Sequence, residues 1–149
     1  MLIKEEVNLE CKLELDVKIK FYQKVLSELM EGTLNDAKSS AGDKHETSRS
    51  MMQIEQEKTG KQMKELEEMK IYFDKIKSNS NNDKIQIGSL IKTNIGYFYI
   101  AVALGKLKVG KEEVYVISPI SPLGSKLLGL SLNNSIEINN KKVIIEFIY

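Results

Sequence analysis

Hydrophobic residues in the first part of the chain recur at the three- and four-residue spacing of an amphipathic helix. Residues 2–34 contain no proline, and their first glycine is Gly32. One hydrophobic series is spaced like the seam of a coiled coil and consists of Leu15, Ile19, Tyr22, Leu26 and Leu29. A second series, spaced by four, consists of Leu9, Leu13, Val17, Phe21 and Val25. The pattern predicts one long helix whose wide hydrophobic face suits a partner helix and a second surface.

Residues 50–77 repeat the helical spacing. Their hydrophobic side consists of Met63, Leu66, Met69, Phe73 and Ile76. Glu and Lys fill many of the other positions, which is typical of a solvated helix face with ion pairs four residues apart. The break at residues 36–43 is short, small and polar, and it predicts an antiparallel hairpin. Arms of about 28–30 residues would be ~40–45 Å long and would carry a polar tip near residues 39–47.

The period changes after a polar loop at residues 78–84, which we take as the boundary between domains 1–78 and 85–149. We expect strands at residues 85–91, 97–104, 114–118, 136–138 and 143–148, with residues 105–110 as a connecting loop. Asn139 and Asn140 suit a two-residue hairpin turn because Asn tolerates positive φ. Ser121, Pro122 and Gly129 are placed as the cap, first residue and end of a short helix. The predicted fold class is α+β: a helical hairpin, then a small β-rich domain with one short helix.

Composition narrows the function classes. The chain has 149 residues, 42% hydrophobic and 29% charged, which is typical of a globular protein. A net charge of +1 argues against a protein that mainly coats DNA or RNA. We expect a cytoplasmic protein without membrane contact, because no hydrophobic run is long enough to span a bilayer and residues 1–6 lack the hydrophobic core of a secretory signal. Cys11 is the single cysteine, which excludes an internal disulfide, and its hydrophobic surroundings predict a packing role.

Two carboxylates at the predicted tip could carry chemistry. Asp43 and Glu46 lie three residues apart at the start of a helix, and therefore on one face of it. In one interpretation they form a capping box that satisfies the first N–H groups of the helix. In the other they ligate Mg²⁺, which must then be shared with another molecule because two carboxylates make a poor closed site. His45 is the only histidine, and we expect an exposed tip residue rather than part of a catalytic triad.

Basic residues near the tip are a further candidate site. Lys38, Lys44 and Arg49, extended by Lys58 and Lys61, could contact an RNA or DNA backbone. The alternative is ordinary surface lysine. No Gly-rich phosphate loop, HExxH pair or metal-spaced Cys/His set occurs in the sequence, so nucleotide binding and a closed metal centre are not expected.

Two segments together resemble the Gre family of bacterial transcript-cleavage factors. Residues 42–46, Gly-Asp-Lys-His-Glu, are similar to the family's GDxxE tip and fall midway through the predicted hairpin. Residues 118–129, SPISPLGSKLLG, followed by residues 135–138, are similar to the family's SPLGxxLLG segment and the strand after it, within an FKBP-like domain. Both segments occur in the family's order and at a similar separation, so the resemblance covers most of the chain.

The resemblance implies an accessory factor of RNA polymerase rather than an enzyme. The C-terminal domain would dock at the polymerase secondary channel, with Ser121, Pro122, Leu123 and Gly124 as partner-binding residues. The hairpin would carry Asp43 and Glu46 to the polymerase active site, where they would hold an Mg²⁺ ion beside the nascent RNA so that the polymerase cleaves a backtracked transcript. No cofactor would be bound stably by the factor alone, and we expect a monomer.

One departure from the family leaves two alternatives open. The family's tip usually continues with an aromatic-containing stretch, whereas residues 47–50 here are Thr-Ser-Arg-Ser. A regulator that binds the channel without stimulating cleavage is one alternative. A coiled-coil adaptor for an unrelated partner is the other. Prolyl isomerase activity is not expected, because a shared fold does not confer function.

Overall fold

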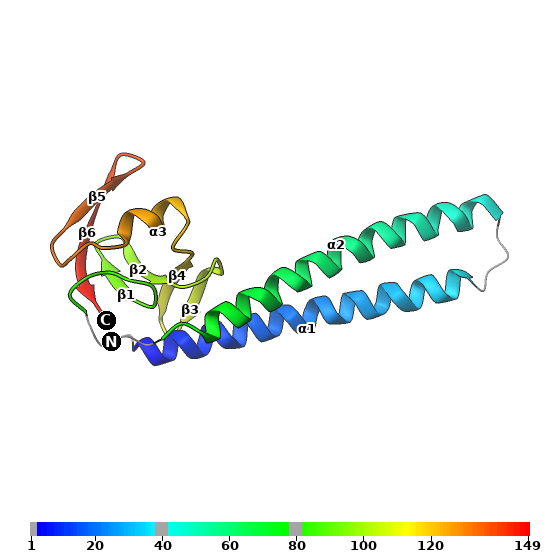
Figure 1. The fold of residues 1–149 in the computed structure, drawn as a ribbon, viewed down its shortest axis with the longest axis horizontal. Coiled ribbons are helices and arrows are strands. Elements are labelled where there is room, and N and C mark those ends of the chain that lie inside the picture. The colour runs from blue at the N-terminus through cyan, green and yellow to red at the C-terminus, as the bar shows by residue number, and fades with distance from the viewer. Residues whose placement is uncertain (1–2, 38–41, 78–81) are drawn as a thin grey trace. The chain divides into compact units, whose positions relative to one another are not determined.

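The computed structural model describes residues 3–37, 42–77 and 82–149, and within them the side chains outside residues 33–46. Two long helices come first, α1 at Lys4–Ala37 and α2 at Gly42–Asp74. A sheet and the short helix α3 at Pro122–Leu127 follow (Figure 1). The predicted α+β class is therefore confirmed. The chain divides into two compact units, one of residues 13–70 and one of residues 1–12 with 71–149.

The unit of residues 13–70 is an antiparallel pair of helices. Lys70 donates a hydrogen bond to Asp16 at 2.7 Å, and the side-chain amide of Gln56 donates to the backbone carbonyl of Leu29 at 3.2 Å. The later residue of α1 thus contacts the earlier residue of α2, so the two helices run in opposite directions. The predicted coiled-coil seam lies inward, with Leu15 and Ile19 buried and its other members half-buried. The hydrophobic spacing of each helix therefore specified the face that meets the other helix.

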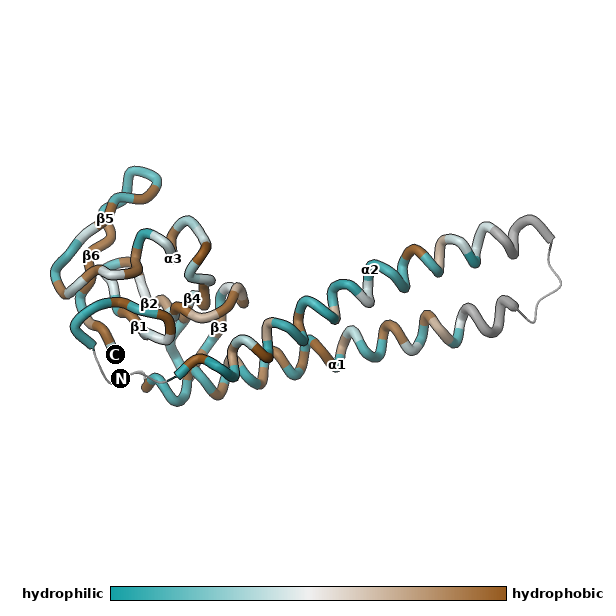
Figure 2. Tube along the Cα trace, in the orientation of Figure 1, coloured by the Kyte–Doolittle hydropathy of each residue, from teal (hydrophilic) through white to brown (hydrophobic). Residues whose placement is uncertain are grey.

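Most of the second hydrophobic series on α1 has no such cover, and only Val25 among its members is half-buried. Leu13, Val17 and Phe21 are 48%, 61% and 58% exposed. Hydrophobic positions recur along much of α1, whereas α2 is mostly hydrophilic (Figure 2). We call Leu13, Val17 and Phe21 the outer stripe of α1.

The described strands form a six-stranded sheet in the order β3-β4-β2-β1-β6-β5. Their bounds are β1 Leu90–Thr93, β2 Gly96–Ile100, β3 Gly105–Val109, β4 Glu112–Ile117, β5 Ser135–Ile138 and β6 Lys141–Ile148. Only the pair β2 and β4 is parallel, because β3 crosses to the sheet edge and returns through a hairpin into β4. All other neighbouring pairs are antiparallel.

One face of the sheet holds the main core. Phe98 and Ile100 on β2 pack there with Ile91, Ile145 and the buried Leu127 of α3. Side chains alternate between faces along a strand, so Tyr99 points to the opposite face. The short helix α3 is thus held by its hydrophobic side against the sheet, and its other side is left to solvent.

Tyr99 anchors helical residues to the opposite face of the sheet. Its hydroxyl donates a hydrogen bond to the side-chain oxygen of Asn8, and its ring meets the ring of Phe73 edge-on, with centroids 6.4 Å apart. Burial raises the pKa of the Tyr99 hydroxyl well above its ordinary value. Val7 and Cys11, which like Asn8 belong to α1, are fully buried. The first turns of α1 are therefore part of the sheet's own unit.

Three predictions about strands were wrong. The strand expected at residues 97–104 ends at Ile100. Residues 85–91 form a strand only from Leu90, because Gly88 has a φ of +94° that an extended strand does not allow. Ile85 instead exchanges backbone hydrogen bonds with residues 129 and 130. Residues 105–110, expected as a loop, form the edge strand β3. The glycines at each end suggested a loop, but the period-two spacing between them is that of a strand, and exposed lysines are typical of a sheet edge.

Two other local predictions were confirmed. Asn139 and Asn140 have φ values of +50° and +64° and connect β5 to β6 as a two-residue turn. Ser121 caps α3, with Pro122 at its first position. Gly129 follows the helix with a φ of +85°, a conformation that glycine adopts without a steric penalty.

A glycine in the middle of α2 offers a way to strengthen the hairpin. A Cβ atom at Gly60 would meet nothing within 4 Å. Gly60→Ala should therefore raise the free energy of unfolding by about 0.5–1 kcal/mol, the helix-propensity difference between the residues. Urea denaturation followed by helical circular dichroism measures it. Gly32→Ala is the matched comparison and should gain less, because its Cβ would lie 3.2 Å from the Met52 methyl group. Equal gains would show that the contact with Met52 does not matter.

The buried thiol of Cys11 reports whether α1 stays docked on the sheet. Burial, with a contribution from the charge of Glu10, raises the pKa of Cys11 to about 12. Since the thiolate is the reactive form, alkylation at pH 8 should be at least about 100-fold slower in the folded protein than in urea. Mass spectrometry of iodoacetamide-treated protein measures the rate. Rapid labelling under native conditions would show that the first turns of α1 detach readily.

Candidate functional site

The loop before α3 is held by one serine side chain. The Ser121 hydroxyl donates to the Ser118 carbonyl at 2.6 Å and accepts from the Gly124 backbone N–H at 3.0 Å. The Ser121 backbone N–H also donates to the Ser118 carbonyl, at 3.1 Å. Ser125 adds a backbone hydrogen bond to the Ser121 carbonyl at 2.8 Å. Residues 118–125 therefore form one closed turn, which fixes the position of any side chain that projects from it.

Gly124 is buried where this turn closes on itself. A Cβ atom added there would lie 2.0 Å from the Ser118 carbonyl oxygen and 2.8 Å from the Ser121 hydroxyl. The first of these atoms is backbone and is held by two hydrogen bonds, so it cannot move aside freely. Glycine is therefore needed at this position for packing, whatever else the segment binds.

The predicted partner-binding residues divide into two kinds. Ser121 and Gly124 have the structural roles just described. Leu123, which is part of α3, is half-buried against the hydrophobic core of the sheet. Pro122 is exposed. Ile120, which the sequence analysis did not single out, is 90% exposed beside it. The surface offered to a partner here is therefore built from Ile120 and Pro122, and no sequence pattern indicated the exposure of Ile120.

The backbone of the two acidic residues Asp43 and Glu46 lies at the start of α2. That helix begins at Gly42, eight residues earlier than the sequence pattern predicted, so the backbone of Asp43 and Glu46 is helical. Residues three apart in a helix share a face. The side chains of Asp43, Lys44, His45 and Glu46 lie outside the described residues, as does the whole of Lys38. The capping-box and Mg²⁺-ligand interpretations therefore both stay predictions.

The basic residues that the structure describes do not gather on one face. Arg49, Lys58 and Lys61 are all exposed on α2. Nine residues separate Arg49 from Lys58, which is two and a half helical turns and puts them on opposite faces. A continuous basic strip through both is therefore not formed. A contact between Arg49 and a nucleic-acid backbone stays a prediction for that residue by itself.

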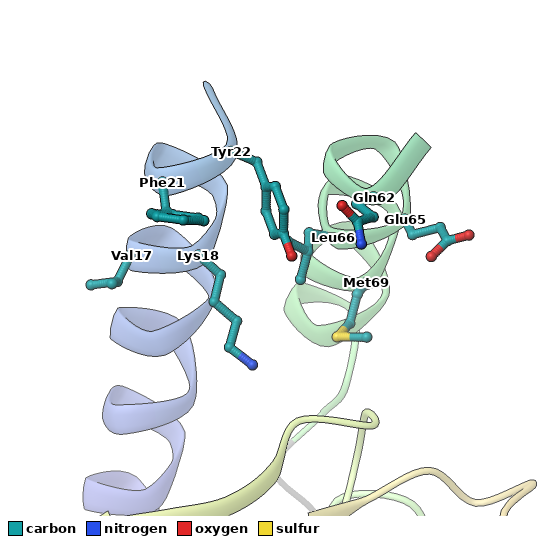
Figure 3. A pocket seen from close by; sticks show the side chains of 8 residues that line it. All are labelled: Val17, Lys18, Phe21, Tyr22, Gln62, Glu65, Leu66 and Met69. Atoms are coloured by element: carbon teal, nitrogen blue, oxygen red, sulfur yellow. The ribbon is translucent and has the colours of Figure 1, made fainter. Parts of the chain in front are cut away.

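A groove runs between the two helices of the hairpin. It has a volume of about 530 Å³, and its lining includes Phe21 and Tyr22 of α1 with Leu66 and Met69 of α2. Tyr22 lies between the helices, and Val17 also lines the groove with its side chain pointing away from α2 (Figure 3). The lining is mainly hydrophobic and holds no cluster of acids or bases, so the groove suits packing rather than chemistry.

One ion pair joins the helices near the base of the hairpin. Lys70 contacts Asp16 at 2.7 Å, and its hydrogen bond and charge lower the pKa of Asp16 below the ordinary value of 3.8. Both side chains are close to half exposed. An ion pair in this setting sets the alignment of the two helices more than it stabilises them.

Comparisons with known proteins add a structural likeness. No protein-family model matches the chain, and no curated protein matches it. Among solved structures, the chain is similar to that of the transcription factor Gfh1, with 16% sequence identity over 93% of this chain and 92% of that chain and a TM-score of 0.39. Function does not transfer at this level, and the fold class rests on the elements described above.

Within the described residues, no group of three or more His, Cys, Asp or Glu side chains could hold a metal ion. None of the described helices is long and hydrophobic enough to cross a membrane. The described part of the chain offers a built surface at the turn before α3 and, among its exposed hydrophobic residues, the outer stripe of α1.

Proposed function

We propose that this chain is a Gre-like factor that binds RNA polymerase at its secondary channel and stimulates cleavage of backtracked transcripts. Asp43 and Glu46 would supply two carboxylates to an Mg²⁺ ion held jointly with the polymerase. The metal would then activate water and stabilise the leaving oxygen, while the polymerase positions the RNA. The factor itself needs no closed active site.

The observation that carries this proposal is where the two Gre-like segments fall in the fold. The GDxxE segment begins at Gly42, the first residue of α2. The SPLGxxLLG segment forms the capped turn and α3, with strand β5 after it. If the two matches were coincidental, we would not expect one segment at the start of the second hairpin helix and the other in the hydrogen-bonded turn of the β-rich unit.

The helix lengths also suit delivery of a tip to a distant site. At 1.5 Å per residue, the 34 residues of α1 extend over roughly 50 Å. Two packed helices resist bending better than one, because the seam holds them together along their length. An acid at the tip of such a hairpin can reach a metal centre that a globular surface could not.

A second candidate function has its own support. Residues 47–50 lack the aromatic that usually follows the GDxxE tip in the Gre family. If that aromatic helps to position the carboxylates, the protein would bind the channel without promoting cleavage and would act as a regulator of transcription.

One assay separates these functions. Cognate RNA polymerase is stalled and backtracked on a template with labelled RNA, and the purified protein is added with Mg²⁺. Shortened transcripts support the cleavage factor. Binding to polymerase in a pull-down without shortened RNA supports the regulator. A protein that does neither is not a polymerase factor, and the proposal then fails.

A further inference from the structure

The outer stripe of α1 has a charge pattern that is symmetric about one residue. Val17 is at its centre, with Leu13 four residues before it and Phe21 four residues after it. Glu14 lies three residues before Val17, and Lys20 lies three residues after it. The same helix has Glu10 and Lys24 at seven residues on either side of Val17. At these four positions acids precede the centre of the stripe and bases follow it, at matching distances; Lys12 departs from this pattern, and Glu14 also lies 3.9 Å from Lys18 of its own helix.

Such a stripe is complementary to itself when two copies run in opposite directions. Rotation by 180° about an axis through Val17 places the acidic end of one copy beside the basic end of the other. It also places Leu13 of one copy opposite Phe21 of the second. A parallel arrangement would instead put acid beside acid and base beside base, which costs energy. Interfaces in twofold dimers pair a surface with itself in this way.

We propose that the protein self-associates as an antiparallel dimer through the outer stripe, with the two Val17 side chains meeting at the twofold axis. Three exposed hydrophobic side chains in a row on one helix leave apolar area in water, and the second copy covers it. The ring of Phe21 is already held edge-on to Tyr22, with centroids 5.4 Å apart, so less side-chain freedom is lost on pairing. An unrelated partner would not require the symmetry about Val17.

The interface is small, and the dimer is correspondingly weak. Stable complexes bury about 1,200–2,000 Å² in total, which a single helix face does not provide. We expect a dissociation constant on the order of tens of micromolar or weaker. The monomer expected from the sequence would then be the species at low concentration. This inference does not rest on polymerase binding and is tested with the purified full-length chain.

Cysteine crosslinking tests the register. In the proposed dimer Val17→Cys pairs with itself at the axis. The two copies of residue 13, and likewise of residue 21, are about 12 Å apart along the helices, beyond the ~7 Å reach of a disulfide. Under mild oxidation at roughly 100 µM, Val17→Cys should crosslink at least about five-fold more than Leu13→Cys or Phe21→Cys alone. A mixture of those two variants should crosslink with each other. The native Cys11 is buried and does not interfere.

Charge substitution provides a second readout, measured by sedimentation equilibrium without oxidation. Glu14→Lys should weaken the dimer by at least about three-fold, and Glu14→Lys combined with Lys20→Glu should restore it, because the double variant only exchanges the two ends of the pattern. Equal crosslinking of the three single cysteine variants, or no dimer at all, overturns the proposal. If Val17→Glu weakens polymerase binding while the wild type stays monomeric, the occupant of the stripe is polymerase and the dimer is rejected.

Discussion

Replacing Gly124 with alanine should lower the free energy of unfolding by about 3 kcal/mol. This is the upper end of the cost usually found when a methyl or methylene group is inserted into a close-packed site. The new methyl group would lie 2.0 Å from the Ser118 carbonyl oxygen. Moving that carbonyl away would break the two hydrogen bonds that Ser121 donates to it. Moving Gly124 instead would lose the hydrogen bond of its N–H to the Ser121 cap, which is itself worth about 1 kcal/mol. Either movement therefore destabilises the folded state.

Urea denaturation followed by tyrosine fluorescence measures this effect in the β-rich unit. Ser125→Ala is the matched control, because Ser125 is exposed in the same helix and its hydroxyl bonds only to the Pro122 carbonyl, at 3.1 Å. That change should stay within about 0.5 kcal/mol. Should Gly124→Ala prove as stable as Ser125→Ala, the close approach to Ser118 would be wrong, and packing would not explain why this position is glycine.

The helices were predictable because their periodicity is long and has one interpretation. Two hydrophobic series of α1 were visible in the sequence, and the heptad spacing of one of them indicated the seam. The burial of Leu15 against the exposure of Val17 agrees with that prediction. The start of β1 was misplaced and β3 was taken for a loop. One reason is their length, which is four residues for β1 and five for β3. At that length a single glycine decides the outcome. Gly88, with a φ of +94°, lies before β1 and delays its start, whereas Gly105, with a φ of +80°, is the first residue of β3.

The candidate site was predictable in its motifs but not in its geometry. Ser121 and Pro122 were recognised as helix punctuation from residue type alone. The need for glycine at position 124 could not be predicted, because it depends on the path of the backbone at Ser118. The exposure of Ile120 likewise follows from the turn and not from its neighbours in sequence. The residue most available to a partner was therefore the one that local patterns did not indicate.

Substituting either tip acid should abolish the proposed cleavage activity. With Asp43→Ala or Glu46→Ala, the rate of transcript shortening in the backtracked complex should fall by about 100-fold or more, as when one stabilising group is removed from a charged transition state. Binding to polymerase should be retained, because the proposed docking surface is on the β-rich unit and not at the tip. Each variant should therefore compete with the wild-type protein for polymerase, which separates loss of chemistry from loss of docking.

Amide substitutions distinguish a metal ligand from a helix cap. Asn caps a helix about as well as Asp, and Gln replaces Glu in a capping box, so Asp43→Asn and Glu46→Gln should leave the helix start intact. They remove the negative charge that Mg²⁺ requires of its protein ligands. If the carboxylates bind metal, the amide variants should be as inactive as the alanine variants at ordinary Mg²⁺ and should recover in part as Mg²⁺ is raised. If the amide variants cleave like the wild type, the acids only cap α2 and the metal-sharing mechanism is rejected. Normal polymerase binding with no cleavage even by the wild-type protein would instead leave the channel regulator as the better description.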